Sequence, residues 1–103
     1  MDEKLKSMLG LTKRAGKLAI GTENVMSSIK CGKAKAVFLA CDISENTAKK
    51  IKDSCNYYKK EWLSLPLDMD KLSTALGKEC NVSSVAIEDS GLCGAVKKLL
   101  REE

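Results

Sequence analysis

The segment Gly21–Lys35, GTENVMSSIKCGKAK, carries the side chains of this sequence that are best suited to recognise a ligand. Gly21, Thr22, Glu23 and Asn24 stand at the predicted start of a helix, where unpaired N–H groups and the helix dipole attract phosphate oxygens. Gly21 lets a backbone or a base approach closely. An asparagine amide can donate and accept at a base edge, and a carboxylate can accept from the amino and imino groups of guanine.

The same residues also have a purely structural interpretation. Thr22 would then be the N-cap, and Glu23 would be favourable in the first turn because it faces the positive end of the helix dipole. A carboxylate beside a polyanion is unfavourable unless a specific group pairs with it, so a binding role for Glu23 requires such a partner. Both interpretations stay open on these residues alone.

Catalytic chemistry has little support in this sequence. The chain has no histidine, which excludes Ser-His and Cys-His catalysis. The carboxylate pairs Asp68/Asp70 and Glu88/Asp89 are better explained as charges at helix starts. Neither a GxxxxGK[ST] phosphate loop nor a GxGxxG motif occurs. We therefore predict a binding module that is not an enzyme and that needs no cofactor.

The five cysteines, at positions 31, 41, 55, 80 and 93, predict neither a metal site nor disulfides. No pair has CxxC spacing, and zinc sites normally take close Cys or Cys/His pairs. Cys41 and Cys55 fall at apolar positions of the predicted elements. We expect them to be buried and reduced, in a protein of the reducing cytoplasm.

Length and composition fit one domain, residues 1–103, of which 44% are hydrophobic. No apolar stretch approaches the ~18–20 residues that a membrane helix needs, and the N-terminus lacks a signal-peptide pattern. Residues 1–60 carry 13 Lys or Arg and 6 Asp or Glu, whereas residues 61–103 carry 5 and 8. This asymmetry favours a polyanionic partner on one surface, and we expect a monomer without a membrane or small-molecule partner.

Helices and strands alternate along the chain. Leu5, Met8, Leu9 and Thr12 have helical spacing, and residues 36–41 form a continuous apolar run, as in a strand buried on both faces. The other expected helices lie between Thr22 and Gly32, over Ala48, Ile51, Cys55 and Tyr58, between Asp68 and Gly77, and after a cap at Asp89 or Ser90. The other expected strands are 17–20, 61–65 and 84–87. The order αβαβαβαβα predicts an α/β fold, a three-layer α/β/α sandwich around a four-stranded mixed sheet.

Three segments, LGLTKRAGKLAIGTENV, IKCGKAKAVFLACDISENTAKKI and ALGKECNVSSVAIEDSGL, resemble the kink-turn-binding ribosomal-protein superfamily of the L-seven-Ae and L-thirty-e type. The resemblance is greatest to its small bacterial branch, the YlxQ-like proteins, and covers about residues 4–100. It implies the same α/β/α fold. It also implies a non-catalytic, ribosome-associated protein that recognises a structured RNA.

The resemblance implies particular contacts. In kink-turn binders a Gly-Thr-Asn-Glu block, with a lysine one turn later, reads sheared G·A pairs at the start of the second helix. Here Glu23 and Asn24 are in exchanged order, and Ser27 occupies the lysine position. Family lysines near Lys33 and Lys35 would meet phosphates. The loop before the last strand would pack on a flipped-out base, with apolar surface from Cys80 and Val82; here it is Lys78, Glu79, Cys80, Asn81 and Val82.

Another function remains open: a protein-interaction module that kept the fold and lost the RNA contacts. RNA binding releases counterions and weakens steeply with salt, so salt dependence separates the two functions.

Overall fold

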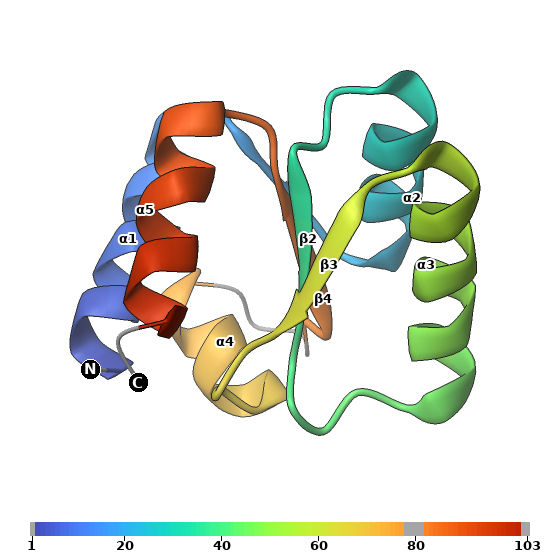
Figure 1. The fold of residues 1–103 in the computed structure, drawn as a ribbon. Helices are drawn as coiled ribbons and strands as arrows, with labels where there is room; N and C mark the ends of the chain where they lie inside the picture. The colour runs from blue at the N-terminus through green and yellow to red at the C-terminus, as the bar shows by residue number, and fades with distance from the viewer. Residues whose placement is uncertain (1, 78–81, 102–103) are drawn as a thin grey trace.

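The computed structural model describes residues 2–77 and 82–101, which form helices and strands in the predicted order (Figure 1). The helices are α1 (Asp2–Arg14), α2 (Thr22–Cys31), α3 (Glu45–Tyr58), α4 (Met69–Ala75) and α5 (Ser90–Arg101). The strands are β1 (Leu18–Ile20), β2 (Ala36–Leu39), β3 (Glu61–Ser64) and β4 (Ser84–Ile87). None of the described helices is long and apolar enough to span a membrane.

The strands form one mixed sheet in the order β1-β4-β2-β3. β4 is antiparallel to both β1 and β2, and β2 is parallel to β3, so β1, β2 and β3 run in one direction. Ile20, Leu39 and Ser84 therefore lie at one end of the sheet, which we name the β4-start end. The four-stranded mixed sheet predicted from the sequence is confirmed.

The sheet lies between two helical layers, with α1, α4 and α5 on one face and α2 and α3 on the other (Figure 1). Strand β2 is buried along its whole length, as its continuous apolar run predicts. Phe38 faces the core of the first layer, and Val37 faces that of the second. The α/β/α sandwich is confirmed.

Several helix ends follow from local sequence. Gly32 ends α2 in the left-handed conformation, with φ 79°. The Asp68 carboxylate accepts from the Lys71 N–H at 2.8 Å, and Asp89 accepts from the Leu92 N–H at 2.8 Å. Such caps stabilise a helix by ~0.5–2 kcal/mol each.

One prediction of burial is wrong, and the buried face of α3 is shorter than its residue pattern. Tyr58 shares the helical pattern of Ala48, Ile51 and Cys55 but is 38% exposed, at the last residue of α3. Cys41 is exposed because β2 already ends at Leu39. The Cys41 N–H donates to the Leu67 carbonyl at 2.9 Å, and its side chain faces solvent.

Two other thiols are in the core, and the predicted burial of Cys55 is confirmed. Cys55 and Cys93 are buried, and burial raises the pKa of both thiols. For Cys93 the Lys97 ammonium lowers the pKa and Glu61 raises it, each less than burial does. Cys31 is exposed at the end of α2, and Cys80 lies outside the described residues.

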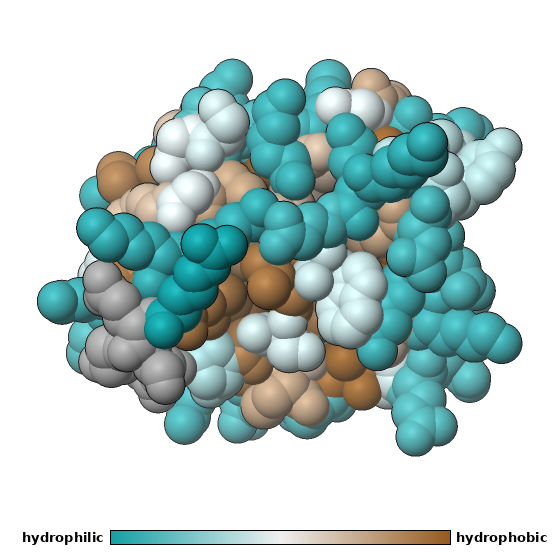
Figure 2. Space-filling model, in the orientation of Figure 1, coloured by the Kyte–Doolittle hydropathy of each residue, from teal (hydrophilic) through white to brown (hydrophobic). Residues whose placement is uncertain are grey.

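The outer surface is uneven in polarity. Figure 2 shows hydrophilic residues over the side where α3 lies and hydrophobic surface near the centre of the same view. A shallow hollow on this edge of the sheet is lined by Leu63, Pro66 and Leu100 beside the Lys97–Glu61 ion pair. β3 is the last strand in the order of the sheet, and apolar side chains line the hollow beside it.

Candidate functional site

The start of α2 depends on the backbone of Gly21. This residue has φ 93° and ψ 153°, a combination open essentially only to glycine. Its carbonyl accepts the first intrahelical bond, from the Val25 N–H at 2.9 Å, so Gly21 is the N-cap. The prediction of Thr22 as N-cap is wrong: Thr22 is the first helical residue, because the single glycine makes the turn from β1 into α2.

Gly21 also connects the start of α2 to the strand beside β1. Its N–H donates to the Ser84 carbonyl at 3.1 Å, and the Ala40 N–H donates to the Ser83 carbonyl at 2.8 Å. The chain that enters β4 thus lies at the β4-start end, next to Gly21. Gly21 and Ser84 are far apart in the sequence and meet here, as a single interface between α2 and the loop before β4 would require.

The loop itself is only partly described. Lys78, Glu79, Cys80 and Asn81 lie outside the described residues. The Val82 side chain is 3% exposed in the core under α4, and its N–H donates to the Ser73 hydroxyl at 2.7 Å. Val82 therefore does not offer the exposed apolar surface that the resemblance implied, because the chain has already turned inward toward β4.

Asn24 is held in a defined orientation. Its amide Nδ2 donates to the Ile20 carbonyl at 2.8 Å, across the turn that Gly21 makes. The amide has a second hydrogen and a carbonyl oxygen, and the side chain is exposed, so both can meet a ligand. Glu23 is exposed beside it, in the first turn of the helix.

A groove runs along α2 beside β1. It has a volume of about 420 Å³ and follows one helical face through Asn24, Ser27, Ser28 and Cys31. Lys33 lines its far end, beyond the C-cap. The structure thus joins Lys33 to Asn24 and Ser27 along a single groove.

Lys35 lies elsewhere. It stands directly before β2, its N–H donates to the Ile87 carbonyl at 2.7 Å, and it is not among the residues that line the groove. Helix α2 has 10 residues, which at ~1.5 Å per residue separates Lys35 from Gly21 by roughly 15 Å. The structure therefore does not bring Lys35 to the start of α2.

Two groove residues were missed from the sequence. The Ser28 hydroxyl donates to the Glu88 carboxylate at 2.6 Å, and Glu88 lines the groove. Glu88 was interpreted as a helix-start charge, a role that its neighbour Asp89 fills instead. No local signal links Ser28 to Glu88, because the contact depends on how α2 packs against the end of β4.

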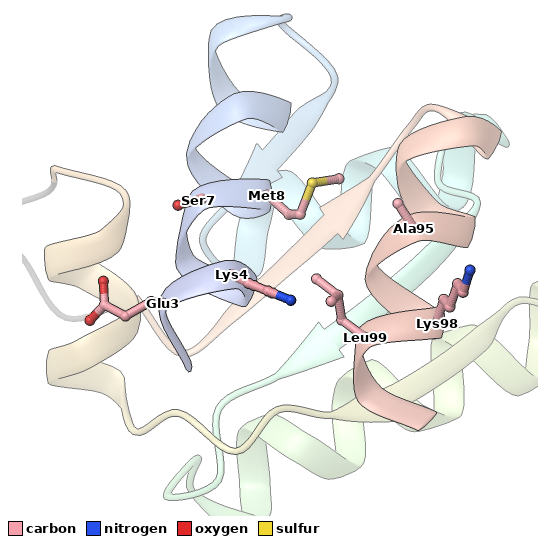
Figure 3. Close-up of a pocket in the computed structure, with 7 residues that line it drawn as sticks. All are labelled: Glu3, Lys4, Ser7, Met8, Ala95, Lys98 and Leu99. Carbon is pink, nitrogen blue, oxygen red and sulfur yellow. The ribbon is translucent and has the colours of Figure 1, made fainter. Parts of the chain in front are cut away.

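A second hollow, between α1 and α5, has a volume of about 540 Å³. Figure 3 shows Lys4 and Met8 extending from α1 toward Leu99 and Ala95 of α5, while Glu3 and Ser7 project away on the other side of α1. Its lining is mainly apolar, and the Lys4 ammonium alone does not make the set of convergent polar groups that orients a ligand.

Residues 3–96 match the model of the Ribosomal protein L7Ae/L30e/S12e/Gadd45 family. This chain belongs to that family. The chain is 40% identical over 93 residues to the RNA-binding protein YlxQ of Bacillus subtilis, covering 90% of this chain and 91% of that protein. It is 37% identical over 98 residues to the RNA-binding protein YlxQ of Enterococcus faecium, covering 95% and 92%.

Two solved structures have the same fold as this chain. A Bacillus halodurans C protein of unknown function superposes with a TM-score of 0.86 at 28% identity, over 95% of this chain and 97% of that chain. The 15.5 kDa RNA-binding protein of Giardia lamblia superposes with a TM-score of 0.77 at 15% identity, over 97% and 83%. The large ribosomal subunit protein eL30 of Candida albicans is 32% identical over 94 residues, covering 87% and 85%.

Proposed function

We propose that this family member is a non-catalytic protein that binds a structured RNA through the start of α2 and the groove beside it. The observation that carries the proposal is the Gly21 turn. It presents the first N–H groups of α2 and the oriented Asn24 amide at the sheet end where the chain enters β4. The names of the YlxQ relatives support RNA as the ligand.

The chemistry of each group suits part of an RNA. The N–H groups at the helix start and the helix dipole favour phosphate oxygens. Asn24 can pair with a base edge, and Glu23 can accept from guanine. Lys33, exposed at the far end of the groove, supplies a charge for the backbone.

We further propose a kink-turn, in ribosomal RNA, as the ligand. The major groove of regular A-form RNA is too narrow for side chains to read, whereas a sharp kink opens it to a helix end. Glu23 and Asn24, the two side chains proposed to contact bases, are both exposed in the first turn of α2. An exposed turn of this kind can enter an opened groove.

Ser27 limits the expected affinity. It is exposed in the groove one turn after Glu23, where a lysine could reach a phosphate or a guanine acceptor. A serine carries no charge and is too short. One charged contact is worth ~1.5–3 kcal/mol, so we expect Ser27→Lys to strengthen kink-turn binding by roughly ten- to a hundredfold.

The test is a titration of one labelled kink-turn RNA, with an uninterrupted duplex of equal length for comparison, at two salt concentrations. Asn24→Ala should weaken kink-turn binding by ~1–3 kcal/mol and leave duplex binding unchanged. Lys33→Ala should weaken binding to both RNAs and reduce the salt dependence of binding. Lys98→Ala, at an exposed lysine on α5 across the sheet, is the matched control and should leave kink-turn affinity close to wild type.

Equal affinity of the wild type for the kink-turn and the duplex would refute kink-turn recognition. Unchanged affinity in both Asn24→Ala and Lys33→Ala would refute the α2 groove as the RNA site.

A further inference from the structure

Helix α3 ends in two exposed aromatic side chains. Tyr57 is 77% exposed and Tyr58 is 38% exposed. Their ring centroids are 4.8 Å apart with an angle of 89° between the ring planes, an edge-to-face pair. Tyr57 is the more exposed of the two, so most of its side-chain surface is accessible to a ligand.

Three lysines lie close to the end of α3 in the sequence or in the sheet. Lys59 follows directly and is exposed, with φ 57°, and Lys60 leads into β3. Lys35 and Lys60 directly precede Ala36 and Glu61, which are paired in the parallel register of β2 and β3. Lys35 and Lys60 therefore lie at the ends of adjacent strands. We name Lys35, Tyr57, Tyr58, Lys59 and Lys60 the α3-end surface.

Nearby carboxylates are mostly engaged within the protein. Glu61 pairs with the Lys97 ammonium at 2.5 Å, and Glu88 accepts from Ser28 at 2.6 Å. Asp53 is exposed one turn before Tyr57 and is the acidic neighbour on α3. Among the described residues, the salt bridge is formed by Lys97 and Glu61. None of the lysines of the α3-end surface takes part in it, so their ammonium groups are available to bind phosphates.

The α3-end surface is remote from the start of α2. Because β1, β2 and β3 are codirectional, α2 and α3 both start at the β4-start end and finish at the opposite end. Helix α3 has 14 residues, about 21 Å at ~1.5 Å per residue. A base stacked on Tyr57 therefore does not touch Gly21 or Asn24.

We propose that the α3-end surface binds a single-stranded RNA segment, with a base stacked on Tyr57 and the neighbouring phosphates on Lys35, Lys59 and Lys60. Exposed aromatic rings among cations are the arrangement that holds single strands, because every base has a flat face and every linkage a negative charge. A regular duplex keeps its bases stacked and offers none to Tyr57. The surface lies at the opposite end of the sheet from Gly21 and Asn24, and its Lys35 is two residues from Lys33 at the far end of the α2 groove.

The test uses a fluorescein-labelled oligouridylate of about ten nucleotides, followed by anisotropy, with an RNA duplex of the same length for comparison. Tyr57→Ala should weaken single-strand binding by roughly five- to a hundredfold, and Tyr57→Phe should bind like wild type because the ring remains. Leu11→Ala, at an apolar side chain that is 51% exposed on α1, is the matched control and should not change affinity.

The Lys59→Gly variant removes a positive charge from the surface without disturbing the fold. Glycine accepts the positive φ at this position, so the variant should fold as wild type while its single-strand affinity and salt dependence both decrease. Asn24→Ala should leave single-strand binding unchanged, which distinguishes this surface from the groove on α2. The proposal is overturned if the wild type does not bind the single strand, if Tyr57→Ala binds it equally well, or if Asn24→Ala weakens it as much as Tyr57→Ala does.

Discussion

Replacing Gly21 by alanine should destabilise the protein through backbone strain alone. At φ 93° and ψ 153° a side-chain-bearing residue is strained by ~1–3 kcal/mol. A Cβ added at Gly21 would meet no atom within 4 Å, so no steric contact adds to this strain. Alanine regains ~0.4–1 kcal/mol by reducing the entropy of the unfolded chain. The expected net loss in free energy of unfolding is about 1–2 kcal/mol.

The assay is equilibrium unfolding in urea, monitored by far-UV circular dichroism. With m of ~1–2 kcal/mol/M for a small protein, the midpoint of Gly21→Ala should fall by about 1 M. Gly94→Ala is the matched control: Gly94 lies inside α5, without a positive φ, and its added Cβ also meets nothing within 4 Å. This variant should gain ~0.5–1 kcal/mol. Equal midpoints for Gly21→Ala and wild type would refute the role assigned to the turn.

Three further predictions concern the groove and the thiols. Ser28→Ala should lower the free energy of unfolding by ~1.5–3 kcal/mol because it removes a hydrogen bond to the Glu88 carboxylate; Glu88→Gln should cost less, and equal urea midpoints for Ser28→Ala and wild type would contradict this. Burial raises the pKa of Cys55 above its ordinary value of 9.0. The buried neutral thiol therefore contributes fully to the free energy of unfolding below pH 9.0, and this contribution is lost as pH rises through the folded-state pKa. The stability advantage of wild type over Cys55→Ala should therefore shrink between about pH 7 and about pH 10, and a constant difference would argue against a buried neutral thiol. In the native protein, alkylation followed by peptide mass spectrometry should label the exposed Cys31 and Cys41 before Cys55, whereas equal labelling of Cys55 would show an accessible core.

The sequence by itself determined which elements form and in what order. The apolar run of β2 can be stable only when both faces are covered, and that requirement already predicts helical layers on both sides of the sheet. Gly32 and Asp68 end or begin helices through bonds to residues a few positions away. Such signals are local, because helix caps and hydrophobic periodicity act within one or two turns of the chain.

Only the tertiary structure decided which side chains share a surface. Ser28 bonds to Glu88 across sixty residues, and Lys35 becomes the neighbour of Lys60 through the parallel register of β2 and β3. Val82 turns into the core although its segment reads as an exposed loop. Each outcome depends on strand order and on the packing of helices on the sheet, to which residues from the whole chain contribute. For that reason the sequence could suggest candidate residues such as Asn24 and Lys33, whereas only the fold groups side chains into a groove along α2 and a surface at the end of α3.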